Sequence, residues 1–214
     1  MCGQTSAGVA MKLIAVSQRV DILSDRNERR DSIDQRWTDF LRRCGLVPIP
    51  IPNQKDAAQA LLSNVSVVGI LLTGGADLAD YGGDSPERDE TELFLIDHAA
   101  SKALPLIGVC RGMQCLLHKY GNRLRTIEGH VGVRHEMSFL SPKSSRIVNS
   151  FHKWAPGEIN CEFSIEARGS DQSVEAVKHV RYPFLGIMWH PEREPVFSKE
   201  DIEIFRQYFL GSLK

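Results

Sequence analysis

The stretch around Cys110 limits most strongly what this chain can fold into. Residues 103–109 are apolar and typical of a buried parallel strand, and residues 114–120 favour a helix. A strand that turns at once into a helix is the geometry of a nucleophile elbow, and Gly108 and Gly112 allow the sharp bend. A helix N-terminus beside the sulfur also favours thiolate over thiol. A lone cysteine is ordinarily a small buried apolar residue, but these flanks predict that Cys110 is a nucleophile.

A second apolar strand, residues 184–189, ends at His190-Pro191-Glu192. A nucleophilic thiol needs a base that takes its proton, and the base needs a third group that fixes its tautomer. His190 and Glu192 supply both, and their spacing of two in an extended chain points the side chains the same way. The sequence therefore predicts a catalytic triad of Cys110, His190 and Glu192.

The other histidines fit the role of base less well. His98 and His118 fall on predicted helices, and His179 falls in a polar, turn-like stretch. The three that remain candidates for lining a pocket are His130, His135 and His152.

A third buried strand, residues 67–72, runs into Thr73-Gly74-Gly75. Glycines in such a turn leave backbone N–H groups unobstructed. Beside the elbow, the turn can form an oxyanion hole with the amides of Gly75 and Arg111 as donors. A Thr-Gly-Gly turn by itself is an ordinary loop, but together with the other two motifs it fits acyl transfer.

These motifs resemble those of the class I glutamine amidotransferase-like superfamily and, within it, the γ-glutamyl hydrolase branch of peptidase C26-like proteins. The resemblance covers essentially the whole chain. It rests on Gly74-Gly75-x-Asp77, Tyr81-Gly82, Gly108-x-Cys110-Arg111-Gly112-x-Gln114, Val148-Asn149-Ser150-Phe151-His152 and His190-Pro191-Glu192.

The resemblance implies a flavodoxin-like three-layer α/β sandwich with a mostly parallel central sheet. It also implies cleavage of a γ-glutamyl amide through a thioester, with no cofactor and no metal. The substrate-binding residues implied by it are Gly74, Gln114, Asn149, Ser150, Phe151 and His152.

Hydrophobic periodicity is consistent with such a fold. Strands are expected at residues 13–16 and 46–51, the second at a sheet edge because of its prolines. Helices are expected around Trp37, at 55–63, at 90–102 and after Ser198, with a polar loop at 21–30. After Gly121 the pattern alternates, which predicts a β-rich insert of short strands: 123–127, 135–140, 145–148, 162–167 and 174–179.

Length and composition place the chain among single-domain enzymes. With 214 residues, we expect one catalytic domain over 11–214 and a small polar leader over 1–10. N-terminal nucleophile amidotransferases also begin Met-Cys-Gly and use Cys2, but here the leader separates Cys2 from the first strand. Five cysteines without paired spacing fit reduced thiols in a cytoplasm.

Charge and hydropathy exclude several partners. The net charge of −1 gives no electrostatic case for nucleic acid or an anionic membrane. No apolar run approaches the roughly twenty residues that span a bilayer. We therefore expect a small-molecule γ-glutamyl substrate as the partner, and the oligomeric state, a homodimer included, stays open.

The leaving group of that substrate is harder to infer. Seven arginines between residues 19 and 43 suit phosphate, yet six acidic residues lie among them, so a solvated, salt-bridged segment explains most of these charges. Arg19 is the exception, because it directly follows a strand into the ligand crevice of an open sheet. The segments 16–20 and 34–37 and the compact length resemble bacterial γ-glutamyl-CDP-amidate hydrolases of capsule phosphoramidate synthesis, which implies a cytidine nucleotide conjugate.

Three other functions stay open. The first is a γ-glutamyl-polyamine or γ-glutamyl-GABA type of hydrolase. The second is a glutaminase module that feeds ammonia to a synthetase, and the third is an inactive binding protein on the same scaffold. Glutamine turnover in the presence of a synthetase tests the second, and thiol labelling near neutral pH tests the third.

Overall fold

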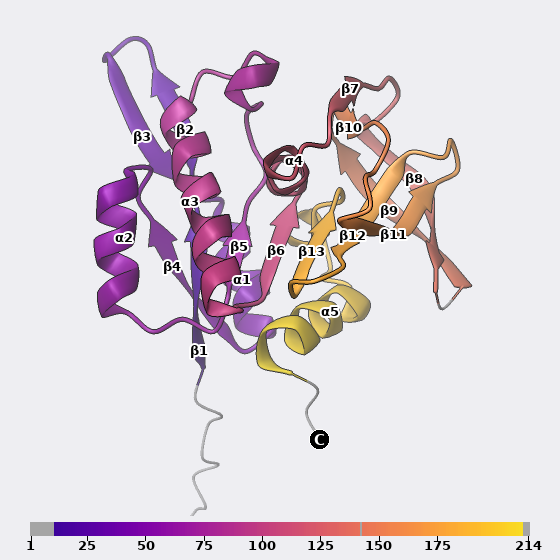
Figure 1. The fold of residues 1–214 in the computed structure, drawn as a ribbon. Helices are drawn as coiled ribbons and strands as arrows, with labels where there is room; N and C mark the ends of the chain where they lie inside the picture. Colours follow the sequence, from indigo (N-terminus) through magenta and orange to yellow (C-terminus); the bar gives the residue numbers. More distant parts are fainter. Residues whose placement is uncertain (1–10, 142, 212–214) are drawn as a thin grey trace, which may run out of the picture.

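A nine-stranded sheet runs through the centre of the molecule (Figure 1). The computed structural model describes residues 11–141 and 143–211. Five strands lie side by side in parallel: β4 (Leu46–Ile51), β1 (Lys12–Ser17), β5 (Ile70–Leu72), β6 (Leu106–Val109) and β13 (Phe184–Ile187). Four antiparallel strands continue the sheet: β12 (Val174–His179), β11 (Phe163–Gly169), β8 (Val131–Leu140) and β9 (Lys143–Phe151).

Helices cover both faces of the parallel half. One face packs against α2 (Lys55–Asn64), α3 (Pro86–Lys102) and α4 (Arg111–Lys119), and the other against α1 (Gln35–Arg43) and α5 (Lys199–Leu210). The period of two in β1 explains this arrangement: Ala15 joins the first core, whereas Ile14 and Val16 join the second. The expected three-layer α/β fold is confirmed.

The helix boundaries follow local capping chemistry. The Asp34 carboxylate accepts a hydrogen bond from the Arg36 amide at the start of α1, and the Ser198 hydroxyl accepts one from the Asp201 amide at the start of α5. Helix α3 begins four residues before the expected position, because Pro86 occupies its first turn, where no N–H is needed. Trp37 is core, only 3% exposed, as its place in the apolar stripe of α1 predicts.

The β-rich segment after α4 extends the central sheet instead of forming a separate layer. Figure 1 shows it as the orange strands to the right of the parallel strands. Among the described residues of this segment, only β7 (Leu124–Thr126) and β10 (Trp154–Pro156) leave the central sheet, and they form a small antiparallel sheet of their own. The proline-containing strand β4 lies at the opposite edge, where the sequence places it.

Two local expectations are wrong. Residues 21–30 are not a loop throughout, because β2 (Arg19–Leu23) and β3 (Glu28–Ser32) form a hairpin there. The hairpin is mostly solvent-exposed, so its strands lack the apolar alternation that marks a half-buried strand. His179 does not lie in a turn-like stretch; it ends β12, as the strand expected over 174–179 implies, and it is buried among aromatic rings.

Most of the N-terminal arginines form ion pairs, as the mixed charges predict. The pairs are Arg19–Asp21, Arg26–Asp25, Arg29–Glu87, Arg30–Glu28 and Arg36–Asp34. Over the part of the chain that the structure describes, no helix is long and apolar enough to cross a membrane. Residues 1–10, the expected leader with Cys2, lie outside the described residues.

Candidate active site

Cys110 occupies a sharp turn between β6 and α4. Its φ of 52° and ψ of −107° are unusual for a residue other than glycine and cost backbone energy that the surrounding packing must offset. The neighbouring glycines make the turn possible: a Cβ on Gly108 would meet the backbone carbon of Gly112 at 2.6 Å, and one on Gly112 would meet the Leu72 carbonyl oxygen at 2.2 Å. The side chain of Cys110 therefore lies at the carboxyl end of the sheet, beside the N-terminus of α4.

His190 follows β13 and meets the cysteine. Its Nδ1 lies 2.7 Å from Glu192 Oε1, and both side chains are 2% exposed. Burial acts to lower the pKa of His190, but the charges of Cys110 and Glu192 and hydrogen bonds to both outweigh burial and raise the pKa to about 9. At neutral pH the imidazole therefore carries a proton beside the Cys110 sulfur.

The glycine turn after β5 packs directly against this pair. A Cβ on Gly74 would meet the His190 ring at 2.5 Å, so only glycine fits there. Arg88, fully buried in α3, donates to the carbonyl oxygens of Thr73 and Gly74 at 2.7 and 3.0 Å. Because a trans peptide points its C=O and N–H in opposite directions, the Gly75 N–H points away from Arg88.

A buried ion cluster behind the turn joins it to the elbow. Glu92 in α3 accepts hydrogen bonds from Ser17 at 2.8 Å and from Arg88 at 2.9 Å, and it pairs with Arg111, the first residue of α4. Burial alone would raise the pKa of Glu92, but the two guanidinium groups hold it below its ordinary value. Sequence reasoning missed Arg88 and Glu92, although their i, i+4 spacing on one helix was a signal of an ion pair.

The Asn149–Phe151 segment lies on the other side of His190. The Asn149 side chain bonds the backbone of His190 twice, accepting from its N–H at 2.9 Å and donating to its C=O at 2.8 Å. The Phe151 ring meets the imidazole edge-on at 5.7 Å and is 40% exposed. Arg193, which the sequence did not single out, stacks its guanidinium over Phe151 at 4.7 Å.

Three of the implied substrate-binding residues have their side-chain hydrogen bonds elsewhere. Gln114 donates to the Trp154 carbonyl at 2.9 Å, and His152 Nδ1 lies 3.1 Å from the same oxygen. Ser150 donates to the His130 carbonyl at 2.7 Å. Burial lowers the pKa of His152 to about 4, against the opposing effect of Glu175.

Arg19 lines a small cavity that opens beside the glycine turn. Gly74, Gly75, Glu192 and Arg193 contribute to the same cavity, whose volume is about 30 Å³, room for about one water molecule. The Arg19 side chain is half exposed and pairs with Asp21 at 2.7 Å. An exposed pair of this kind contributes little free energy, so Arg19 is available to another anion.

Cys110 differs from the other cysteines that the structure describes. Cys44 and Cys115 are buried, and burial raises the pKa of the Cys44 thiol to about 12 and that of Cys115 well above its ordinary value. Cys161 is exposed and unpaired. Only Cys110 among these four combines a helix N-terminus with an adjacent histidine.

The fold has a counterpart among solved structures. A GMP synthase-type protein from Thermoplasma acidophilum superimposes with a TM-score of 0.71 at 21% identity, over 93% of this chain and 92% of that one. The chain therefore shares the α/β fold of that protein.

Sequence comparison shows to which family of proteins the chain belongs. The peptidase C26 family model matches residues 12–138 and 126–192, so the chain belongs to the peptidase C26 family. A γ-glutamyl-CDP-amidate hydrolase from Campylobacter jejuni is 28% identical over 92% of this chain and 96% of its own length. A γ-glutamyl-γ-aminobutyrate hydrolase from Escherichia coli O157:H7 is 28% identical over 75% of this chain and 78% of its own.

Proposed function

We propose that this protein hydrolyses γ-glutamyl amides, with Cys110 as nucleophile, His190 as base and Glu192 as the group that orients the base. The observation that carries the proposal is the 2.7 Å contact of Glu192 with a buried His190 whose pKa the neighbouring Cys110 helps to raise. Family membership and both hydrolase relatives support the same reaction class.

The chemistry follows from these positions. The Cys110 thiolate attacks the γ-carbonyl carbon, and the carbon–nitrogen bond breaks as His190 donates its proton to the leaving nitrogen. This step leaves a γ-glutamyl thioester on Cys110. Neutral His190 then takes a proton from water, whose oxygen attacks the thioester, so that glutamate leaves and the thiolate is restored.

The oxyanion of both tetrahedral intermediates needs preorganised donors. We assign them to the amides of Gly75 and Arg111. Arg88 supports the first by holding the Thr73 and Gly74 carbonyls, and the Glu92–Arg111 pair supports the second by anchoring the first turn of α4. Asn149 serves here as a positioning residue, because both of its bonds to His190 are to backbone atoms.

For the leaving group we propose a cytidine diphosphate amidate, released as cytidine diphosphoramidate for capsule phosphoramidate synthesis. The C. jejuni relative, matched over nearly its full length, supports this choice. Arg19 and Arg193 line one cavity beside the glycine turn and offer two guanidinium groups to phosphate oxygens. The cavity is too small for a nucleotide, so the nucleoside must lie outside it. Arg19 is paired with Asp21 much as Arg29 and Arg30 of the hairpin are paired with Glu87 and Glu28, so the choice of Arg19 as the phosphate contact rests on its place in the cavity.

The test measures kcat/KM of the Arg19→Ala variant on two substrates, one with phosphate and one without. Losing a charge-assisted phosphate contact costs about 1.5–3 kcal/mol, about ten- to a hundredfold in kcat/KM. Arg19→Ala should lose this factor on γ-glutamyl-CDP-amidate and much less on a γ-glutamyl amide without phosphate. Arg42→Ala, an exposed arginine of α1, is the matched control and should lose it on neither.

Equal losses on both substrates would count against the nucleotide and assign Arg19 to the glutamyl pocket or the fold. Preferred turnover of γ-glutamyl-γ-aminobutyrate would favour the polyamine-type substrate. Glutamine turnover that rises strongly with a synthetase would favour an ammonia-supplying module. A cytoplasmic location stays a prediction, which fractionation tests, and light scattering decides the oligomeric state, which the sequence leaves open.

A further inference from the structure

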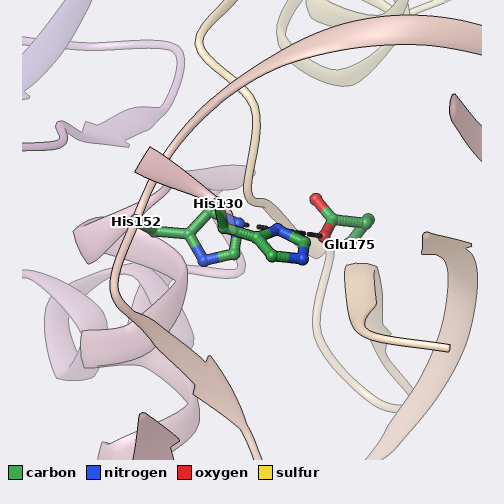
Figure 2. A group of neighbouring side chains, drawn as sticks. All are labelled: His130, His152 and Glu175. Carbon is green, nitrogen blue, oxygen red and sulfur yellow. Dashed lines mark ion pairs between the residues drawn. The ribbon is translucent and has the colours of Figure 1, made fainter. Parts of the chain in front are cut away.

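Three buried side chains that the proposed mechanism does not use converge beside the antiparallel half of the sheet (Figure 2). His130 precedes β8, His152 follows β9, and Glu175 lies in β12. They are 4%, 3% and 0% exposed, and one ligand atom from each lies within 4.8 Å of the other two.

The neighbours of His130 determine which of its nitrogens carries the proton. Nε2 lies 3.0 Å from the Asp171 carboxylate, which can only accept, so Nε2 is the donor. The Ser150 hydroxyl donates its single proton to the His130 carbonyl oxygen at 2.7 Å. In the neutral ring Nδ1 therefore keeps a lone pair. Nδ1 lies 3.4 Å from the Ser150 hydroxyl oxygen and 3.8 Å from Glu175 Oε1, which also accepts a hydrogen bond from Ser173 at 2.9 Å.

In His152 the proton and the free lone pair lie on the opposite ring nitrogens from those in His130. Nδ1 lies 3.1 Å from the Trp154 carbonyl oxygen, an acceptor, so Nδ1 holds the proton. Nε2 is buried without a hydrogen-bond partner and faces the same Glu175 oxygen at 3.8 Å. Two imidazole lone pairs and one carboxylate thus point at a common centre.

Lone pairs and a carboxylate that face one another without a hydrogen atom between them are stabilised by a cation at the centre. A direct N–H···O bond would be about 2.7–3.2 Å long, shorter than either 3.8 Å contact. A tetrahedral zinc ion with bonds of about 2.0–2.2 Å holds its ligand atoms about 3.3–3.6 Å apart. The two 3.8 Å contacts to Glu175 must shorten by a few tenths of an ångström and the widest pair, at no more than 4.8 Å, by up to about 1.5 Å, so the three side chains move together when the ion binds.

The groups around these three side chains match the usual surroundings of zinc ligands. Metal-bound histidines almost always donate their other N–H to a carboxylate or a backbone carbonyl, as His130 does to Asp171 and His152 does to Trp154. The second oxygen of Glu175 is a buried atom without a hydrogen-bond partner, and His135 Nε2 lies 3.6 Å from it.

We propose that His130 Nδ1, His152 Nε2 and Glu175 Oε1 bind a divalent transition-metal ion, with Zn²⁺ as the best match. Two imidazoles and one carboxylate are a zinc donor set. The metal would join the end of β9 to β12. Strand β12 lies beside the candidate active site, because the Glu175 carbonyl accepts a hydrogen bond from the amide of Met188 at 2.8 Å, and Met188 is two residues before His190. The ion would be separate from the thiol chemistry of Cys110, and its three protein ligands leave a fourth position open to water.

The experiment measures metal directly, in protein from which any affinity tag has been removed. The Cys110→Ser variant serves as the parent, so that zinc on the catalytic thiol does not count. After chelator treatment and gel filtration, the parent is titrated with ZnCl₂ and analysed by plasma mass spectrometry and thermal melting. We expect about one equivalent of zinc per chain and a higher melting temperature, because a ligand that binds only the folded state stabilises it.

Two further variants locate the ion. Glu175→Gln and His152→Gln, each in the parent, keep side-chain size and hydrogen bonding but should lose the zinc and the gain in melting temperature. His179→Gln is the control, a buried histidine 3.6 Å from Glu162 in another aromatic cluster, and should keep both.

Failure of the parent to take up zinc, or uptake that survives Glu175→Gln, would overturn the proposal. If the ligand variants do not fold, Co²⁺ in the parent decides the question by its absorption spectrum. A spectrum without thiolate charge transfer supports the His-His-Glu site, and a thiolate band overturns it.

Discussion

Replacing Glu192 by glutamine removes one negative charge from the candidate triad and changes its volume little. The carboxylate contacts His190 Nδ1 at 2.7 Å with both side chains buried, so solvent screens the interaction weakly. The Glu192 charge stabilises the imidazolium form, and its loss therefore lowers the pKa of His190 from the value of about 9.

The size of the effect follows from the contact. A hydrogen bond to a charged group contributes about 1.5–3 kcal/mol. Since 1.36 kcal/mol corresponds to one pH unit, the pKa of His190 should fall by about one to two units. The weaker orientation of the base should also reduce kcat/KM by about ten- to a hundredfold at neutral pH.

A pH profile of kcat/KM on a chromogenic γ-glutamyl anilide measures both effects. The wild-type rate should fall as pH rises through about 9, where His190 loses the proton it donates to the leaving nitrogen. In Glu192→Gln this descending limb should move to lower pH, whereas Glu203→Gln, an exposed change on α5, should leave it in place. An unmoved limb in Glu192→Gln, or wild-type activity, would refute the assignment of Glu192 as the orienting group.

Three further predictions concern the nucleophile, the ion cluster and the leader. Cys110→Ala should abolish turnover with an unchanged circular dichroism spectrum, and any wild-type-like turnover would exclude Cys110 as nucleophile. Glu92→Gln leaves the buried Arg88 guanidinium without a carboxylate partner and Arg111 with Asp89 alone, and it should lower the free energy of unfolding by about 3–5 kcal/mol, measured by urea denaturation; a loss under about 1 kcal/mol would show that the cluster stabilises little. Deleting residues 1–10 should leave kcat/KM nearly unchanged, and a dead deletion variant would reopen the role of Cys2.

Much of the fold could be predicted because its signals are local. The strand before Cys110 is apolar throughout, and the glycines on either side are the only residues that fit the turn, so the elbow can be seen within nine residues. The capping residues Asp34 and Ser198 likewise act on amides two and three positions away. The β2–β3 hairpin could not be found this way, because an exposed ribbon of charged residues has no apolar face to alternate.

The sequence by itself determined the layered α/β architecture, the elbow at Cys110 and the pairing of a histidine with a carboxylate two residues later. Only the tertiary structure decided which distant groups surround them. Glu92 meets Ser17 and Arg111 across three elements, and His130, His152 and Glu175 come together from spacings of 22 and 23 residues. Periodicity shows which face of an element is buried, but it says nothing about which polar groups from other strands share that interior. Those contacts depend on strand order and register, and long-range packing sets both.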